Sequence, residues 1–172
     1  MSIRQATPDD AALLCALSAA TFVETFGHLY PREDLAAYLA IAYPEDLQRQ
    51  QLQGGDHAAW ILELAGQPAG FVFAGPCGLP HAHVGPDDGE LKRLYVLAAH
   101  HNAGWGKQLM EAAMAWMEPR FASLWLGVWS ENPGAQRFYA RYGFQRVGQY
   151  EFPVGRVRDL EYILRRPAAA RR

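Results

Sequence analysis

The sequence predicts a single mixed α/β domain whose central sheet is mostly antiparallel and contains one parallel strand pair. The chain has 172 residues, and 50% of them are hydrophobic, which suits one domain with a substantial core. Apolar residues keep helical spacing up to Gly54, whereas strand-like alternation begins at Ala58. Between Glu90 and Val128, a predicted strand, a long helix and a second strand follow one another, and this order is typical of a right-handed parallel unit.

The first part of the chain is predicted to be mainly helical. A short strand is expected over residues 3–6. Thr7 and Pro8 then combine an N-cap with a first-turn proline, so a helix should begin there and continue to the next glycine. Pro31 and Pro44 each mark the start of a further helix, and a pair of glycines ends the second of these.

The remainder of the chain alternates strands with two helices. A hairpin is expected first, because apolar runs over 60–64 and 69–73 flank the turn residues 66–68. A loop rich in glycine, proline, histidine and aspartate is expected over 75–89. The later predicted elements are, in order, a strand from Glu90 to Val96, a helix from Gly104 to Arg120, a strand from Leu124 to Val128, a helix from Asn132 to Gly143, and strands from Phe144 to Tyr150 and from Val157 to Leu164.

Charge and cysteine content narrow the class of protein. A net charge of −2 without clustered Lys or Arg gives no electrostatic case for a nucleic-acid partner or an anionic membrane. The first ten residues do not resemble a targeting segment, and no apolar run approaches the ~20 residues of a spanning helix. Cys15 and Cys77 are too few for a disulfide framework. We therefore expect a soluble cytoplasmic protein, with one domain over 1–166 and a disordered tail over 167–172.

The segment His101-Asn-Ala-Gly-Trp-Gly106, which we call the glycine turn, is predicted to bind a diphosphate. It follows a strand and opens a helix, where free backbone N–H groups and the helix dipole favour anions. A P-loop would need Ser or Thr where Gln108 stands, and a dinucleotide motif would need glycine where Leu109 stands. The alternative is that Gly104 and the last glycine only permit a tight loop and close packing.

Two motifs resemble the GNAT family of acetyl-CoA-dependent N-acetyltransferases. One is the strand Leu94-Tyr95-Val96 followed by the glycine turn, and the other is Asn132-x-x-Ala135-x-x-Phe138-Tyr139-x-x-x-Gly143-Phe144. The resemblance spans nearly the whole chain. It implies a single GNAT-like domain with helices on both faces of the sheet and a splayed parallel strand pair, with acetyl-CoA as co-substrate and no metal. Segments 21–27 and 124–129 further resemble the branch that includes bacterial spermidine/spermine acetyltransferases.

The resemblance also implies roles for individual residues. The family has Gln or Arg at the first position of the turn, so His101 is a departure, and Lys107 offers a positive charge nearby. Tyr139 would protonate the departing thiolate; its alternative role is that of a core aromatic. Asn132 would hold the pantetheine, although it is also a good N-cap. The residues expected to contact the cofactor are Leu94, Tyr95, Val96, His101, Asn102, Ala103, Gly104, Trp105, Gly106, Lys107 and Asn132.

The acceptor side is less constrained by the sequence. Glu90 is the predicted base, directly or through a water, with a solvent-exposed carboxylate as its alternative. Glu24, His28 and Tyr30 are predicted to contact a small-molecule amine, and a polyamine would suit the acidic residues of this region. Two other functions remain open, a CoA-binding sensor domain without turnover and an enzyme that acetylates peptide or protein N-termini. A homodimer is a further expectation.

A metal site is the weakest alternative that the sequence offers. Cys77, His81, His83 and Asp87 fall in one predicted loop, but zinc ligands usually pair at tighter, repeated spacings. Cys15 lies on the apolar side of the first predicted helix, so a small buried thiol is expected rather than a nucleophile. Direct attack by the amine on the thioester is therefore the expected route.

Overall fold

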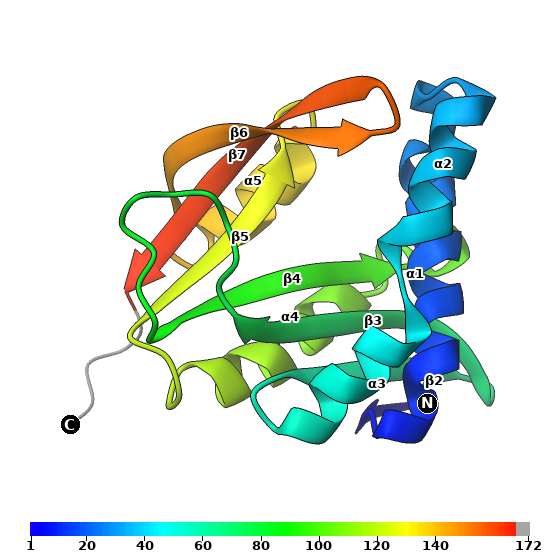
Figure 1. Cartoon of the computed structure of the whole chain (residues 1–172). Helices are drawn as coiled ribbons and strands as arrows, with labels where there is room; N and C mark the ends of the chain where they lie inside the picture. Colours follow the sequence, from blue (N-terminus) through cyan, green and yellow to red (C-terminus); the bar gives the residue numbers. More distant parts are fainter. Residues whose placement is uncertain (168–172) are drawn as a thin grey trace.

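The computed structural model describes residues 1–167, which form one seven-stranded mixed sheet with helices on both faces (Figure 1). The strand order is β1-β2-β3-β4-β5-β7-β6, and the β4–β5 pair alone is parallel. The strands are β1 (Ser2–Gln5), β2 (Ala58–Leu64), β3 (Gln67–Pro76), β4 (Asp88–Val96), β5 (Ser123–Trp129), β6 (Gln145–Val154) and β7 (Val157–Pro167). This confirms the predicted fold class.

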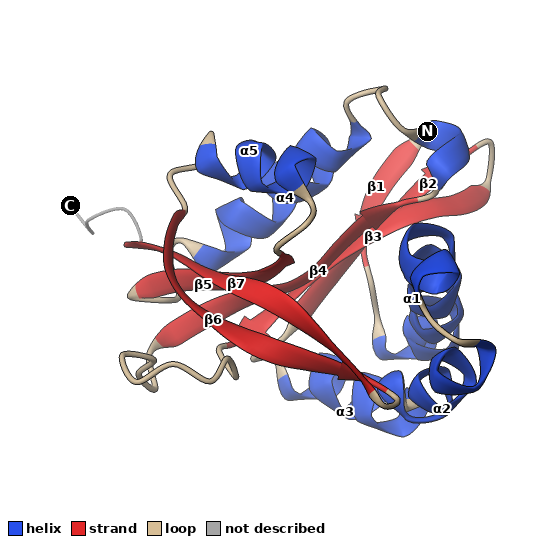
Figure 2. Cartoon of the chain, turned by 90° about the horizontal axis from the view of Figure 1, so that it is seen from above, coloured by secondary structure: helices blue, strands red, loops and turns tan. Residues whose placement is uncertain are grey.

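The helices divide between the two faces of the sheet (Figure 2). On one face, Leu14 and Leu17 of α1 are buried against Phe71 of β3, and on the other, Leu109 and Met110 of α4 enter the larger core. The α-helices are α1 (Ala11–Phe26), α2 (Arg32–Ala42), α3 (Glu45–Gly54), α4 (Trp105–Met117) and α5 (Pro133–Ala140). The short 3₁₀ helices are η1 (Pro8–Asp10), η2 (Gly27–Leu29) and η3 (Ala98–His100).

Several predicted boundaries differ from the observed ones. The strands β3 and β4 extend into the loop predicted over 75–89, because their antiparallel pairing continues as far as Pro76 and Gly89. The helix expected up to Arg120 ends three residues earlier. Of the predicted tail 167–172, Pro167 ends β7, and the rest lies outside the described residues.

The parallel strands β4 and β5 separate soon after they meet. They pair at Asp88–Ser123, Gly89–Leu124 and Glu90–Trp125, and beyond these positions β4 pairs only with β3 and β5 only with β7. The start of the pair is tightly packed, since a Cβ on Gly89 would lie 2.3 Å from the ring of Phe121. The sheet is therefore open between the far halves of β4 and β5.

A bulge in β4 changes which side chains face α1 and α3. Phe73 pairs with Arg93 and Ala74 with Leu91, so Lys92 is an extra residue in the ladder. Leu91 packs in the core on the α4 side. After the bulge, the alternation is shifted by one position, and Arg93 faces the side of the sheet that α1 and α3 cover.

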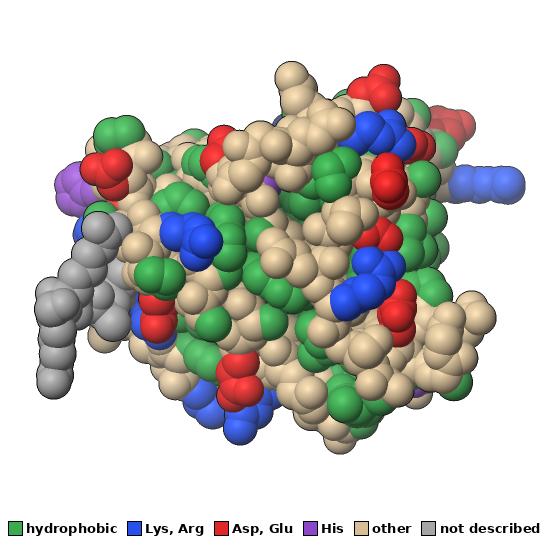
Figure 3. All heavy atoms as spheres, turned by 90° about the horizontal axis from the view of Figure 1, so that it is seen from below, with side chains coloured by type: hydrophobic (Ala, Val, Ile, Leu, Met, Phe, Trp, Pro, Cys, Tyr) green, Lys and Arg blue, Asp and Glu red, His purple; other side chains and the backbone are tan. Residues whose placement is uncertain are grey.

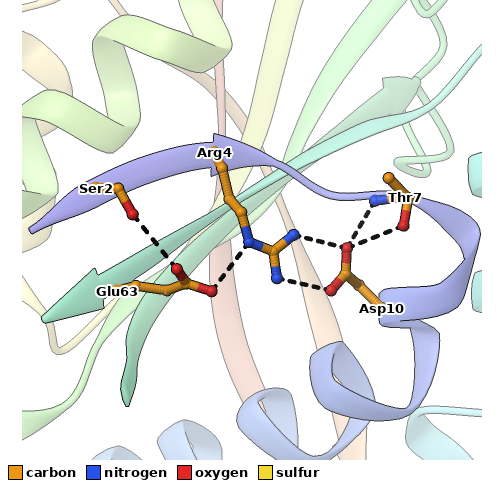
Figure 4. Close-up of polar contacts among 5 residues, drawn as sticks. All are labelled: Ser2, Arg4, Thr7, Asp10 and Glu63. Atoms are coloured by element: carbon orange, nitrogen blue, oxygen red, sulfur yellow. Dashed lines mark hydrogen bonds and ion pairs between the residues drawn. The ribbon is translucent and has the colours of Figure 1, made fainter. Parts of the chain in front are cut away.

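Two ion-pair networks hold the periphery of the domain. Arg4 of β1 donates to Glu63 of β2 at 2.9 Å and to Asp10 of η1 at 2.8 Å (Figure 4). At the opposite end, the buried carboxylate of Asp34 on α2 accepts hydrogen bonds from the backbone and the guanidinium of Arg156, which lies in the β6–β7 turn. Figures 1 and 2 both show this turn beside α2. We call the Asp34–Arg156 contact the hairpin clamp.

The stretch Pro8–Leu29 is long and apolar enough, by length and composition, to cross a membrane, with a mean hydropathy of 1.4. The expectation that no run approaches a spanning helix is wrong by this measure. In the domain, Leu14 and Leu17 of this stretch are buried in the core, and 28% of its most apolar 18-residue window is buried.

On the face seen in Figure 3, acidic and basic side chains are interspersed, and neither kind gathers into a continuous patch among the described residues.

Candidate active site

The glycine turn lies where β4 ends and α4 begins, as the sequence predicts. Asn102 and Gly104 have φ angles of 62° and 82°, and this left-handed backbone turns the chain sharply into the helix. A Cβ on Gly106 would meet nothing within 4 Å, so the first turn of α4 is open to an incoming group. The first N–H groups of a helix have no acceptor within it, and here they border a hollow of about 200 Å³. The residues present therefore fit a diphosphate.

His101 makes a contact that the sequence did not predict. Its Nε2 lies 2.6 Å from the carbonyl oxygen of Val96, the last residue of β4. With a neutral ring, the Nε2–H group donates to that oxygen, and Nδ1 is left without a hydrogen. A contact from the His101 side chain to a phosphate then requires the doubly protonated ring. At the first position of the glycine turn, where the family has Gln or Arg, this chain thus has a histidine whose side chain contacts the end of β4.

Asn132 and Tyr139 lie on or next to α5, on the α4 side of the open strand pair (Figure 2). The Oδ1 atom of Asn132 caps the helix by accepting from the N–H of Ala135 at 3.0 Å, which leaves the Nδ2 group for another partner. The ring of Tyr139 packs against Phe138 and Phe144. Burial raises the pKa of Tyr139 above its ordinary value, so the phenol keeps its proton at neutral pH.

A second cavity, of about 530 Å³, lies on the opposite side of the sheet between β4, the helices α1 to α3 and the β6–β7 hairpin. We call it the aromatic cavity, because Phe22, Tyr38, Tyr43, Phe73 and Phe152 are among the residues that line it. The hairpin clamp joins α2 to the β6–β7 turn at its edge. Residues of both splayed strands also line the cavity, so it reaches the opening between β4 and β5.

Three carboxylates line this cavity, and each has a different partner. Glu90 accepts from Lys92 at 3.1 Å and from the N–H of Gly78 at 2.9 Å. Asp159 accepts from the hydroxyl of Tyr30. Glu161 accepts from the hydroxyl of Tyr150 at 2.7 Å, and neither it nor Asp159 forms an ion pair with any Lys or Arg among residues 1–167.

Glu161 has the electrostatic character of a proton acceptor. Burial raises the pKa of this carboxyl, the hydrogen bond from Tyr150 opposes the rise, and the negative charges of Asp159 and Glu90 add to it. It also lies directly over β5, since a Cβ on Gly127 would come within 2.9 Å of a Glu161 oxygen. A carboxylate whose pKa is raised by burial, and which lies beside the opening of the sheet, binds a proton more readily than an exposed carboxylate does.

The arrangement is that of a two-sided site, with the glycine turn on one face of an open sheet and the aromatic cavity, lined by three carboxylates, on the other. Residues 22–144 match the acetyltransferase (GNAT) family.

The chain belongs to the GNAT family of acetyltransferases.

This GNAT domain is 29% identical over 170 residues to an uncharacterized N-acetyltransferase of Lactobacillus delbrueckii subsp. lactis, a match that covers 96% of each chain. Among solved structures, PaiA N-acetyltransferase from Thermoplasma acidophilum, in complex with coenzyme A, has a TM-score of 0.73 at 17% identity over 97% of this chain and 99% of that one. The ribosomal-protein-alanine N-acetyltransferase of Brucella melitensis has a TM-score of 0.71 at 21% identity, with coverage of 97% and 99%. At these identities, the structural likeness concerns the fold. The GNAT protein is an acyltransferase that acts on amines.

The residues predicted for the acceptor side of this GNAT domain are only partly brought together. Tyr30 and Glu90 line the aromatic cavity. Glu24 is exposed and accepts from the N–H of Ala98, and His28 is exposed on η2, so neither is among the residues that line the cavity. Asp34, an acidic residue in the first turn of α2, is half of the hairpin clamp.

Sequence reasoning missed four charged residues of the cavity, Lys92, Arg93, Asp159 and Glu161. Glu161 stands between Leu160 and Tyr162 in β7, which is a signal that a charge at a sheet position needs a partner or a ligand, whereas Arg93 follows Lys92 and carries no such signal. Within residues 1–167, no group of three or more His, Cys, Asp and Glu side chains could hold a metal ion, which includes the cluster considered in the 75–89 region. His81 of that cluster packs its ring on Trp125.

Proposed function

We propose that the protein transfers an acetyl group from acetyl-CoA to the primary amine of a small molecule, by direct attack in a ternary complex. One observation carries the proposal. The opening between β4 and β5 has the glycine turn on one face of the sheet and the aromatic cavity, with its three carboxylates, on the other. A thioester held in the opening would meet an amine that enters from the cavity. Free thiol and N-acetyl product would then leave by different faces.

The cofactor would be held along one continuous path. Acetyl-CoA supplies the activated acetyl thioester when it is bound. The amides around Gly104 and Gly106 would bind the diphosphate, with Lys107 nearby. The edge of β4 that β5 leaves unpaired, up to Val96, whose carbonyl His101 already contacts, would bind the pantetheine arm as an added strand. The Nδ2 group of Asn132 remains free for the same arm.

Tyr139 is the proposed general acid. In the reaction, the amine nitrogen bonds to the thioester carbon, the carbon–sulfur bond breaks, and the sulfur must gain a proton. Because burial keeps the phenol of Tyr139 protonated, it can supply that proton, a step typically worth about 100- to 10,000-fold in rate. The resulting phenolate then recovers a proton from solvent.

The amine must lose a proton before or during its attack. A primary amine with a pKa near 10 is only about one part in a thousand neutral at pH 7, which corresponds to roughly 4 kcal/mol. Glu90 is the base proposed from the sequence, but Lys92 and the N–H of Gly78 already hold its carboxylate. We favour Glu161, because its partner is a neutral hydroxyl and its pKa is raised.

The acceptor is proposed to be a small molecule, since the aromatic cavity is bordered by α2 and the β6–β7 hairpin rather than by a shallow groove. The carboxylates in the cavity favour a cationic acceptor, and a polyamine is one such molecule. A protein N-terminus is the competing acceptor. We place the reaction in the cytoplasm, since Cys15 and Cys77 are both free thiols.

The test is release of free thiol from acetyl-CoA against a panel of polyamines, amino acids and short peptides. We expect turnover with a small amine, intersecting lines in two-substrate kinetics, and a loss of kcat of about 100- to 10,000-fold in Tyr139→Phe. The affinity for acetyl-CoA should stay unchanged, and Tyr142→Phe on the same segment serves as the matched control. Full kcat in Tyr139→Phe at saturating acetyl-CoA would exclude Tyr139 as the acid. Calorimetric binding of acetyl-CoA without thiol release from any amine would overturn the proposed function.

A further inference from the structure

Arg93 is a cation in the aromatic cavity for which residues 1–167 provide no anion. Its guanidinium donates to two neutral groups, Ser18 Oγ at 3.2 Å and Gln48 Oε1 at 3.5 Å. The rings of Phe73 and Tyr43 flank it, with centroids 4.8 and 5.3 Å away. No carboxylate among residues 1–167 forms an ion pair with it, and three of its five N–H groups make no hydrogen bond to these residues.

This environment is unfavourable for a charge in the ligand-free protein. Burial lowers the pKa of Arg93, which means that the protonated form is less stable here than in water. The two rings offset part of that cost through cation–π contacts. An apolar side chain would fill the same position without any such cost, so an unpaired arginine calls for a further explanation. The β4 bulge is what turns it toward the cavity.

The charges of the cavity do not cancel locally. Lys92 is paired with Glu90 at 3.1 Å, and both are thereby neutralised. Asp159 and Glu161 have only tyrosine hydroxyls as side-chain partners. What remains is one positive group, Arg93, and two negative groups, with no ion pair between them in the described part of the chain. The cavity thus presents separated charges of opposite sign across aromatic walls.

We propose that the acceptor is an amino acid, a molecule that carries its primary amine and a carboxylate on one largely apolar body. This inference rests on the proposed function and names its substrate class. Arg93 would bind the carboxylate with the donors that the protein leaves unused, and the amine would lie toward Glu161 and Asp159, next to the opening of the sheet. The aromatic side chains of the cavity would pack on the body of the acceptor. A polyamine would satisfy the two carboxylates but would add positive charge beside Arg93.

The first experiment uses the unaltered enzyme and three matched acceptors, phenylalanine, phenethylamine and phenylalaninamide, with cadaverine and spermidine as polyamine-type probes. We expect kcat/KM for phenylalanine to exceed that for phenethylamine and for the amide by at least about 30-fold, as for a buried charge pair with one partner removed. 3-Phenylpropionate, a carboxylate without an amine, should compete with the acceptor, and its amide should not. Equal or higher kcat/KM for the uncharged-end analogues would overturn the inference and leave the proposed function intact. No turnover with any acceptor would count against both.

The second experiment tests Arg93 itself. Arg93→Gln should reduce the preference for phenylalanine over phenethylamine to near unity, mainly through KM for phenylalanine, and Arg93→Lys should retain part of it. A purely structural arginine would instead lower kcat/KM for both acceptors by the same factor. If Arg93→Gln does not fold, Gln48→Leu and the competition by 3-phenylpropionate on the unaltered enzyme decide. Gln48→Leu removes one neutral partner of Arg93 and should leave the preference in place.

Discussion

Tyr150→Phe tests whether Glu161 is the base of the reaction. The hydroxyl of Tyr150 donates to a Glu161 oxygen at 2.7 Å, and this hydrogen bond holds the pKa of the buried carboxyl down against the effect of burial. A hydrogen bond to a charged group is worth about 1.5–3 kcal/mol, and one pKa unit corresponds to about 1.4 kcal/mol. Removing the hydroxyl should therefore raise the pKa of Glu161 by about one to two units.

The assay is the pH dependence of kcat/KM for one amine acceptor at saturating acetyl-CoA. In Tyr150→Phe, the acid limb of the profile should move to higher pH by about one to two units, while the rate at high pH stays unchanged. The amine's own titration contributes equally to both enzymes and cancels in the comparison. Glu161→Gln should lose the part of the limb that belongs to this carboxyl and keep only the part that the amine's own titration contributes. An unmoved limb in Tyr150→Phe, together with a lost limb in Glu90→Gln, would assign the base to Glu90 and refute the reasoning.

Stability measurements separate this effect from misfolding. Because the pKa of Glu161 is raised in the folded state, the folded protein holds this proton more tightly than the unfolded chain does. The corresponding stability is present at low pH and is lost as pH rises through the raised pKa. Glu161→Gln removes that loss, so it should be at least as stable as the unaltered protein at neutral pH, although its activity falls.

Two further predictions concern the cofactor turn and the hairpin clamp. A Cβ at Gly106 would meet no protein atom, and Gly106→Leu replaces glycine in a helix, so the free energy of unfolding should rise by about 0.5–1 kcal/mol. The KM for acetyl-CoA should nevertheless increase about tenfold or more, because the new side chain would occupy the place of the diphosphate. Gln108→Leu is the control, and an unchanged KM in Gly106→Leu would contradict a diphosphate at this turn. Asp34→Ala leaves the Arg156 N–H without its acceptor and should lower the melting temperature more than Glu33→Ala does, since Glu33 is exposed and 3.9 Å from Arg156. Arg156 lowers the pKa of Asp34, so this difference should persist at neutral pH and vanish as pH falls through the lowered pKa.

The fold could be predicted from the sequence where periodicity is long and consistent. The segment from β4 through α4 to β5 is such a case, because a 13-residue amphipathic helix between two apolar strands leaves few alternatives. The prediction of a loop over 75–89 was wrong at both ends, because this region has no consistent periodicity. Gly75 and Pro76 are typical of loops, yet they belong to β3 because β4 pairs with them. Pairing between strands depends on residues that are distant in the sequence, so local composition does not predict it.

Some residues of the candidate site could likewise be predicted from the sequence, and others could not. The glycine turn, Asn132 and Tyr139 stand in motifs with fixed spacing, so the sequence places them. Arg93 could not be found in this manner, because strict alternation from Leu91 would put it on the core face, and only the bulge at Lys92 turns it to the cavity. Glu161 belongs to the cavity because β7 lies next to β5, an order of strands that the sequence does not state.

The hairpin clamp also has a consequence for the order in which the protein is made. Asp34 and Arg156 are 122 residues apart in the chain. During synthesis, α2 emerges from the ribosome long before the β6–β7 turn exists, so the wall that closes the aromatic cavity can form only when nearly all of the chain is available. Contacts of such long sequence separation form late, because the loop they close must first be ordered. A nascent chain that stalls before Arg156 lacks β7 as well, so neither the clamp nor the strand that carries Glu161 is available to complete the acceptor cavity.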